Sequence, residues 1–169
     1  MEVLYLFNIG DKIVYPSQGV GIIDSIEEKE FLGNMKKYCS IHLISNSLKL
    51  MMPLDRLSAS NIRPITDSEA LDNALNHMES FADAVDALKD STCKERILNN
   101  TAKFKAGTLQ DFIEVVYNLT EIKKGHTLNT SENQMLKSTR KFLIDEISLI
   151  KDISGSEASD LLDSSLSVI

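Results

Sequence analysis

The sequence predicts a two-domain α+β protein, with a small closed β-barrel over residues 1–65 and an all-α helical bundle over residues 66–169. Two observations lead to this prediction. Up to residue 65, short runs rich in β-branched residues alternate with Gly- and Pro-containing turns, which is typical of strands. Beyond Arg63-Pro64 the apolar residues recur at helical spacing, and helix-capping residues precede each run. The boundary is therefore expected near residue 65.

Four or five short strands are expected in the first domain. The clearest are residues 12–15, 20–26, 37–43 and 47–53. Pro16-Ser17-Gln18-Gly19 predicts a turn after the first strand, and Leu32-Gly33-Asn34 predicts a turn after the second. Short strands joined by tight turns favour a small closed barrel. Gly19 and Gly21 are expected where backbones approach closely.

The helices of the second domain are expected to follow their capping residues. Thr66 with Glu69 suggests a capping box for a helix from residue 67 to about 81, with an extension to 89 left open. Thr92 with Glu95 is expected to cap a second helix that ends near Gly107.

Two further helices are expected beyond Gly107. Thr108 should open the third, whose apolar stripe runs from Leu109 to Ile122. Thr130 should open a fourth that ends at Gly155, after which residues 155–169 form either a short helix or a frayed tail.

The composition argues against an enzyme and against a strong non-specific DNA binder. The net charge of -7 lies entirely in residues 66–169, because residues 1–65 carry seven acidic and seven basic side chains. No phosphate loop, nucleophile elbow or metal-ligand spacing is present, so no cofactor, metal site or small-molecule substrate is expected. Two cysteines without CxxC spacing fit a reducing cytoplasm. Neither a signal peptide nor a membrane span is expected.

One stretch near the N-terminus is specific enough to indicate a family. Gly10-Asp11-Lys12-Ile13-Val14-Tyr15-Pro16 followed by Gly19-Val20-Gly21 resembles the opening of the CarD-like family of bacterial transcription regulators. Leu32-Gly33, Met52-Pro53 and Ile62-Arg63-Pro64-Ile65 fall at that family's spacings. The resemblance implies an SH3/Tudor-like barrel that docks on the β subunit of RNA polymerase by pairing strands across the interface. It carries Lys29 and Met51 over as candidate polymerase contacts.

The second half resembles the helical domain of the same family, which contacts DNA at the upstream edge of the melted promoter. The family uses a tryptophan there as a wedge. This chain has no tryptophan, and the wedge position falls on Cys93, which is too small to stack on a base. The candidate DNA contacts are Cys93 and the basic residues near it and on the fourth helix, namely Lys94, Arg96, Lys103, Lys105, Lys137, Arg140 and Lys141. For Cys93 the alternative is a partly buried position in the core of the helical domain.

Two functions remain open at this stage. In the first, the chain is a polymerase-bound regulator whose helical domain approaches promoter DNA and stabilises the melted state. In the second, the helical domain is an adaptor for another protein, which the missing tryptophan and the acidic charge favour. For the basic residues, a surface paired with Asp and Glu is an equal alternative to a DNA-binding patch. Whether regulation is positive or negative is left open.

Overall fold

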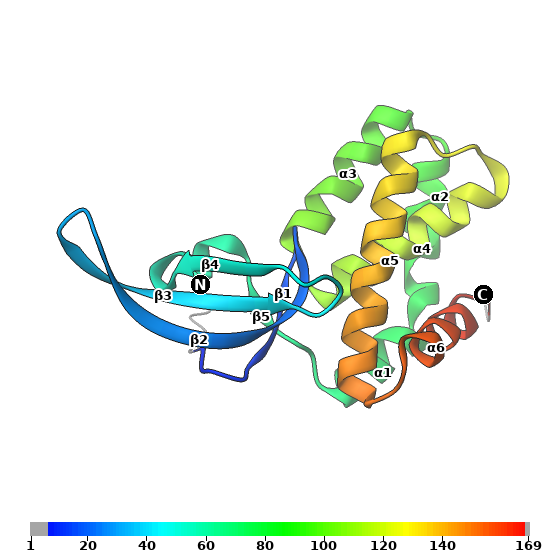
Figure 1. Ribbon diagram of the computed structural model, residues 1–169. Coiled ribbons are helices and arrows are strands. Elements are labelled where there is room, and N and C mark those ends of the chain that lie inside the picture. The colour runs from blue at the N-terminus through cyan, green and yellow to red at the C-terminus, as the bar shows by residue number, and fades with distance from the viewer. Residues whose placement is uncertain (1–6, 168–169) are drawn as a thin grey trace. The chain divides into compact units, whose positions relative to one another are not determined.

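The computed structural model describes residues 7–167, in which a five-stranded antiparallel sheet precedes six α-helices (Figure 1). The chain divides into two compact units, Met1–Ile65 and Thr66–Ile169. The sheet lies in the first unit, called the sheet unit below. The helices lie in the second, the helical unit.

The strands of the sheet unit follow the order β4-β3-β2-β1-β5, with antiparallel pairing throughout. The bounds are β1 Lys12–Tyr15, β2 Gly19–Phe31, β3 Asn34–Leu43, β4 Lys49–Pro53 and β5 Arg63–Pro64. Two 3₁₀ turns, Leu54–Arg56 and Ser58–Ser60, lie between β4 and β5. Strands β4 and β5 are the two outer strands of this order. Closure of the sheet into a barrel stays a prediction.

Strands β2 and β3 are longer than the sequence predicted and form an extended hairpin (Figure 1). The pairing continues from Gly21 opposite Leu43 to Phe31 opposite Asn34. The predicted turn closes the hairpin with two residues in the left-handed region, Leu32 at φ 51° and Gly33 at φ 77°. Two consecutive positive φ values are typical of the primed turns that match strand twist.

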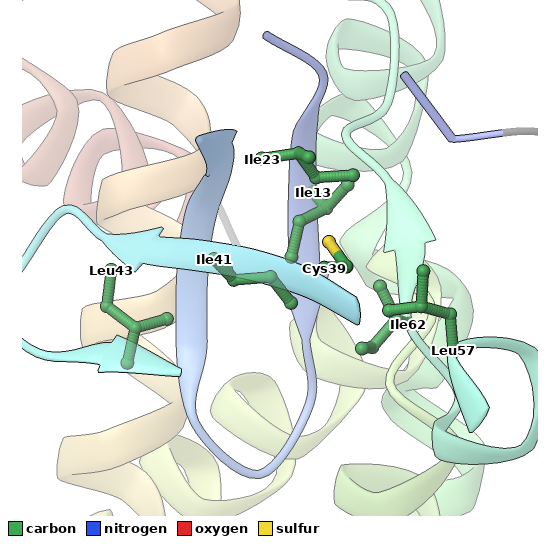
Figure 2. Packing of buried hydrophobic residues seen from close by; sticks show 7 residues of the cluster. All are labelled: Ile13, Ile23, Cys39, Ile41, Leu43, Leu57 and Ile62. Atoms are coloured by element: carbon green, nitrogen blue, oxygen red, sulfur yellow. The ribbon is translucent and has the colours of Figure 1, made fainter. Parts of the chain in front are cut away.

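The core of the sheet unit collects apolar side chains from three strands and the segment before β5. Figure 2 shows this cluster, made up of Ile13, Ile23, Cys39, Ile41, Leu43, Leu57 and Ile62. The close approach expected at Gly21 is confirmed, because a Cβ there would lie 2.8 Å from Ile41 Cγ2 and 2.9 Å from the backbone oxygen of His42. Only glycine fits at this point between β1 and β3.

The helical unit contains α1 Ser68–Asn76, a 3₁₀ turn Met78–Phe81, α2 Ala82–Lys89, α3 Cys93–Ala106, α4 Leu109–Gly125, α5 Thr130–Lys151 and α6 Gly155–Ser167. The predicted stripe of α4 is confirmed as its buried face, with Phe112, Val115 and Leu119 fully enclosed. Three phenylalanine rings, Phe104 of α3, Phe112 of α4 and Phe142 of α5, contact one another at this centre.

The helix starts at Thr92 and Thr108 are confirmed, and each forms a capping box with the third helical residue. The capping box expected for Thr66 and Glu69 is wrong. Asp67 caps α1 instead, and both the amide and the hydroxyl of Thr66 donate to Glu146 on α5. The Thr66 side chain therefore holds the start of the helical unit against α5.

The end of the fourth helix also differs from the prediction. Helix α5 stops at Lys151 because Asp152 adopts a left-handed φ of 54°. Gly155, expected to end the fourth helix, begins α6 instead, and Ser154 and Glu157 bind each other's backbone amides across its first turn. Of the two alternatives for the tail, the helix is the one observed.

Candidate functional sites

The two residues carried over as polymerase contacts lie together on the sheet unit. Lys29 of β2 reaches across β3, so that its Nζ lies 3.4 Å from the Sδ of Met51 on β4. Glu27 lies 3.7 Å from the same ammonium group. Met51 is 53% exposed, whereas its neighbour Met52 packs against the core, so the strand alternation settles which methionine faces out. We call this pair the Lys29–Met51 site.

Strand β4 stands at one end of the sheet order, and among residues 7–167 its five residues pair only with β3. A strand at the edge of a sheet presents main-chain donors and acceptors to any segment that lies alongside. The other end of the order is β5, which is two residues long. Because β4 is longer and carries Met51, it offers the better edge for pairing with another protein.

The helical unit buries Arg96, one of the candidate DNA contacts. This side chain is 7% exposed, and its Nε and Nη2 donate to the two carboxylate oxygens of Glu132 on α5, at 2.7 and 3.3 Å. Its Nη1 donates to the backbone oxygen of Ser91 at 3.2 Å. Each of its three nitrogens thus donates a hydrogen bond inside the protein, which disfavours a contact with phosphate, and the DNA contact of Arg96 stays a prediction. Its function is to join the starts of α3 and α5.

Cys93 lies beside this ion pair and is half-buried. The side-chain amide of Asn129 donates to its Sγ at 2.8 Å, and Sγ lies 3.7 Å from a carboxylate oxygen of Glu132. The position that resembles the family's tryptophan wedge is thus occupied by a small side chain bonded to α5. In this geometry Cys93 packs against the start of α5, and a contact between Cys93 and DNA stays a prediction.

Two more of the candidate DNA contacts form ion pairs on the surface. Lys103 binds Glu114 of α4 at 3.1 Å, and Arg140 binds Asp163 of α6 at 2.8 Å. Lys103 and Arg140 therefore fit the alternative to a DNA-binding patch, in which basic side chains pair with carboxylates on the surface. The remaining candidates are exposed, namely Lys94, Lys105, Lys137 and Lys141.

Within residues 7–167 no group of three or more His, Cys, Asp or Glu side chains is arranged to hold a metal ion. In the same range, no helix combines the length and the apolar character needed to cross a bilayer.

The sequence did not reveal two features that decide which side chains of the two units are exposed. One is Glu132, the buried partner of Arg96, which the sequence showed only as part of an Asn129-to-Glu132 capping pattern. The other is the exposed end of the β2–β3 hairpin. Residues 27–37 lack the apolar alternation of a half-buried strand, and that absence was the available signal.

Comparison with known proteins gives matches over both units. A family described as the CarD-like/TRCF RID domain matches residues 7–66, and one described as the C-terminal domain of CarD matches residues 76–163. The "Putative transcription factor YdeB" of Bacillus subtilis (strain 168) is 41% identical over 148 residues, which cover 88% of this chain and 94% of that protein.

Among solved structures, the solution structure of the 72-residue N-terminal domain of Myxococcus xanthus CarD is similar at 28% identity. That match covers 34% of this chain and 77% of the other, with a TM-score of 0.30. The assignment of the chain therefore rests on the two family matches and on the relative from Bacillus subtilis.

Proposed function

From the premise that the chain belongs to the CarD-like family of transcription regulators, we propose that it binds the β subunit of RNA polymerase through its sheet unit. The observation that carries the proposal is that the family match and the Lys29–Met51 site fall on the same unit. The RID match, which denotes an RNA-polymerase-interacting domain, spans residues 7–66, and the sheet unit it covers has an exposed Lys29–Met51 site beside the edge strand β4.

The mode of binding follows from this geometry. A strand of the polymerase adds to the edge of β4 that no described strand pairs with, where main-chain hydrogen bonds supply affinity without regard to side chains. Met51 then offers an apolar contact and Lys29 a positive charge at the rim, which set the register and favour an acidic neighbour.

The helical unit regulates transcription because the sheet unit holds it near the promoter. A protein that binds the melted promoter complex more tightly than the closed one shifts the equilibrium by the difference in affinity. Three exposed lysines, Lys94, Lys137 and Lys141, are the candidates for phosphate contact. So few charges would give weak DNA binding, which weakens further as salt is raised.

A second function, an adaptor that binds another protein, is favoured by a specific observation. Arg96, Lys103 and Arg140 direct their charges to carboxylates of the same unit, so the basic surface is smaller than the sequence suggested. Residues 67–90 of the same unit carry seven acidic side chains and one basic side chain. DNA binding that is undetectable even at low salt would favour the adaptor over the DNA contact.

Introducing a negative charge at the Lys29–Met51 site should weaken polymerase binding. Lys29→Glu should weaken the binding free energy by about 1 kcal/mol or more, because it places a carboxylate at the rim of an interface where the partner is expected to be acidic. Met51→Glu should cost at least as much, since a charge beside an edge strand opposes strand pairing. The measurement is the affinity of the full-length variants for the isolated β subunit.

Lys12→Glu is the matched control, because Lys12 is equally a strand lysine on the surface but lies on β1, toward the other end of the sheet order. The control should bind like the wild type. If Lys29→Glu and Met51→Glu bind as tightly as the control, the Lys29–Met51 site is not the contact.

A further inference from the structure

The end of the β2–β3 hairpin exposes apolar surface that no described residue of the sheet unit covers. In residues 27–37, which we call the arm, every side chain except Lys29 is exposed. Phe31, Leu32 and Met35 are 59%, 86% and 63% exposed. In Figure 1 the arm extends away from the rest of the sheet, as the blue and cyan hairpin. Three large apolar side chains gathered at one tip are typical of a binding surface rather than of scattered exposure.

The backbone conformation at the tip of the arm is unfavourable for Leu32. Leu32 occupies the first position of the two-residue turn with a φ of 51°. Gly, Asn and Asp adopt that region readily, whereas a leucine there is strained and gains no burial in return. Strain that is not compensated inside the molecule indicates a contact made outside it.

The strand register divides the arm into two faces of different charge. Residues directly opposite each other share a face, so Lys29 lies with Lys36 and Glu28 lies with Lys37. Because side chains alternate along β2, Phe31 lies on the face of Lys29, and Glu30 lies on the face of Glu28. Glu27 lies on the same face, 3.7 Å from the Lys29 ammonium group, so this face carries two lysines and one carboxylate. We call the face with Glu27, Lys29, Phe31 and Lys36 the basic face.

The basic face continues onto the Lys29–Met51 site. Met51 pairs with Ser40, which shares its face of β3 with Lys36 by alternation. The 3.4 Å contact between Lys29 and Met51 joins the two surfaces directly. Lys29 and Lys36 also face each other across the ladder, and like charges in that position weaken a hairpin. Glu27 offsets part of this repulsion, and the net positive charge that remains on the face is suited to a partner that carries carboxylates.

We propose that the arm is a second contact with RNA polymerase, in which Phe31 and Leu32 enter an apolar pocket flanked by acidic side chains. This inference rests on the proposed function and extends the same site along the basic face. The partner is RNA polymerase because the basic face is continuous with Met51, a proposed polymerase contact. The pocket is flanked by acidic side chains because Lys29 and Lys36 lie beside the apolar tip.

The first test removes the apolar tip without harming the fold. In Leu32→Asn the side chain suits the left-handed turn, so the melting temperature should stay the same or rise. The affinity of the full chain for RNA polymerase should fall about tenfold, the loss expected for a central apolar anchor. Phe31→Ser should weaken binding in the same way. Ile9→Asn is the control, because Ile9 is also a turn residue, 63% exposed, before β1.

The second test uses adjacent lysines on opposite faces. Lys36→Glu places a carboxylate opposite Lys29, which favours the hairpin, yet it should weaken polymerase binding several-fold at low salt. Lys37→Glu places a carboxylate opposite Glu28, which disfavours the hairpin, yet binding should not change. If the more stable variant, Lys36→Glu, binds more weakly and the less stable one, Lys37→Glu, binds normally, the loss of affinity comes from a lost contact and not from a folding defect.

Three outcomes decide the inference. If Met51→Glu loses binding while Leu32→Asn and Lys36→Glu bind like the wild type, the arm is not a contact, although the proposed function stands. If the wild-type chain does not bind RNA polymerase, both are overturned. If sedimentation shows that Leu32→Asn turns a dimer of this chain into a monomer, the tip binds a second copy and the inference is overturned.

Discussion

Replacing Glu132 by alanine should destabilise the helical unit by about 3–5 kcal/mol, the cost of leaving a buried charge without its partner. Glu132 is 1% exposed and binds the guanidinium of Arg96 through both carboxylate oxygens. The same carboxylate accepts from the backbone amide of Asn129 at 3.0 Å, so its loss also removes a helix cap. Chemical denaturation of the full chain, followed by helical circular dichroism, measures the effect.

Glu95→Ala provides the matched control for this prediction. Glu95 has the same position in the capping box of α3 as Glu132 has in that of α5, but it is exposed and binds only Thr92. Its removal should cost about 1 kcal/mol, the usual value of a cap. The difference between the two variants isolates the contribution of the Arg96 pair. Equal losses in the two variants would show that the buried pair adds nothing to stability.

The same ion pair predicts a loss of stability in acid. Burial disfavours the charged form of Glu132, but hydrogen bonds from Arg96 and from the Asn129 amide outweigh it, so the pKa of Glu132 lies below its ordinary value. A lowered pKa means that its contribution is complete above the pKa of the unfolded chain and disappears as the pH falls through that of the folded chain. The acid dependence should therefore be weaker in Glu132→Ala than in the wild type.

Gly21→Ala should destabilise the sheet unit by about 1–3 kcal/mol, the range observed when a methyl group is forced into a filled space. The new Cβ would lie 2.9 Å from a backbone oxygen of β3, and a paired strand cannot move aside as a flexible side chain can. Because β2 pairs with both β1 and β3, the displacement disturbs two ladders at once. The expected results are a lower denaturation midpoint and weaker polymerase binding.

Gly125→Ala is the corresponding control, since no atom outside the neighbouring backbone of its own helix lies within 4 Å of the position where its Cβ would be. Gly125 is the last residue of α4, where alanine is a better helix former, so the change should be neutral or slightly stabilising. A Gly21→Ala protein as stable as this control would show that the strands can separate at low cost, contrary to the packing described above.

Local sequence signals predicted most of the fold because they act over a few residues. The capping residues Thr92 and Thr108, the turn at Leu32-Gly33 and the glycine at position 21 each have the expected role. The Thr66 capping box failed because Asp67 competes for the same helix start, and a distant residue, Glu146, takes up the Thr66 hydroxyl. A partner 80 residues away leaves no local pattern.

The candidate sites were harder to predict for the same physical reason. Lys29 and Met51 lie 22 residues apart, and only the β2–β3–β4 pairing brings them together. For Arg96, the sequence shows a basic residue on a helix but not the carboxylate of Glu132, 36 residues later, that buries it. Charge counted along a sequence therefore overestimates the charge available to DNA when ion pairs form between helices.

The most direct test of the account is the binding of the β subunit of RNA polymerase to two pieces of the chain, residues 1–65 and residues 66–169, each checked for folding by circular dichroism. The account predicts that residues 1–65 bind with nearly the affinity of the full chain, because the Lys29–Met51 site, the edge of β4 and the arm all lie there. Residues 66–169 should not bind. A folded sheet unit without affinity for the β subunit, or binding that resides in residues 66–169 alone, would contradict the account.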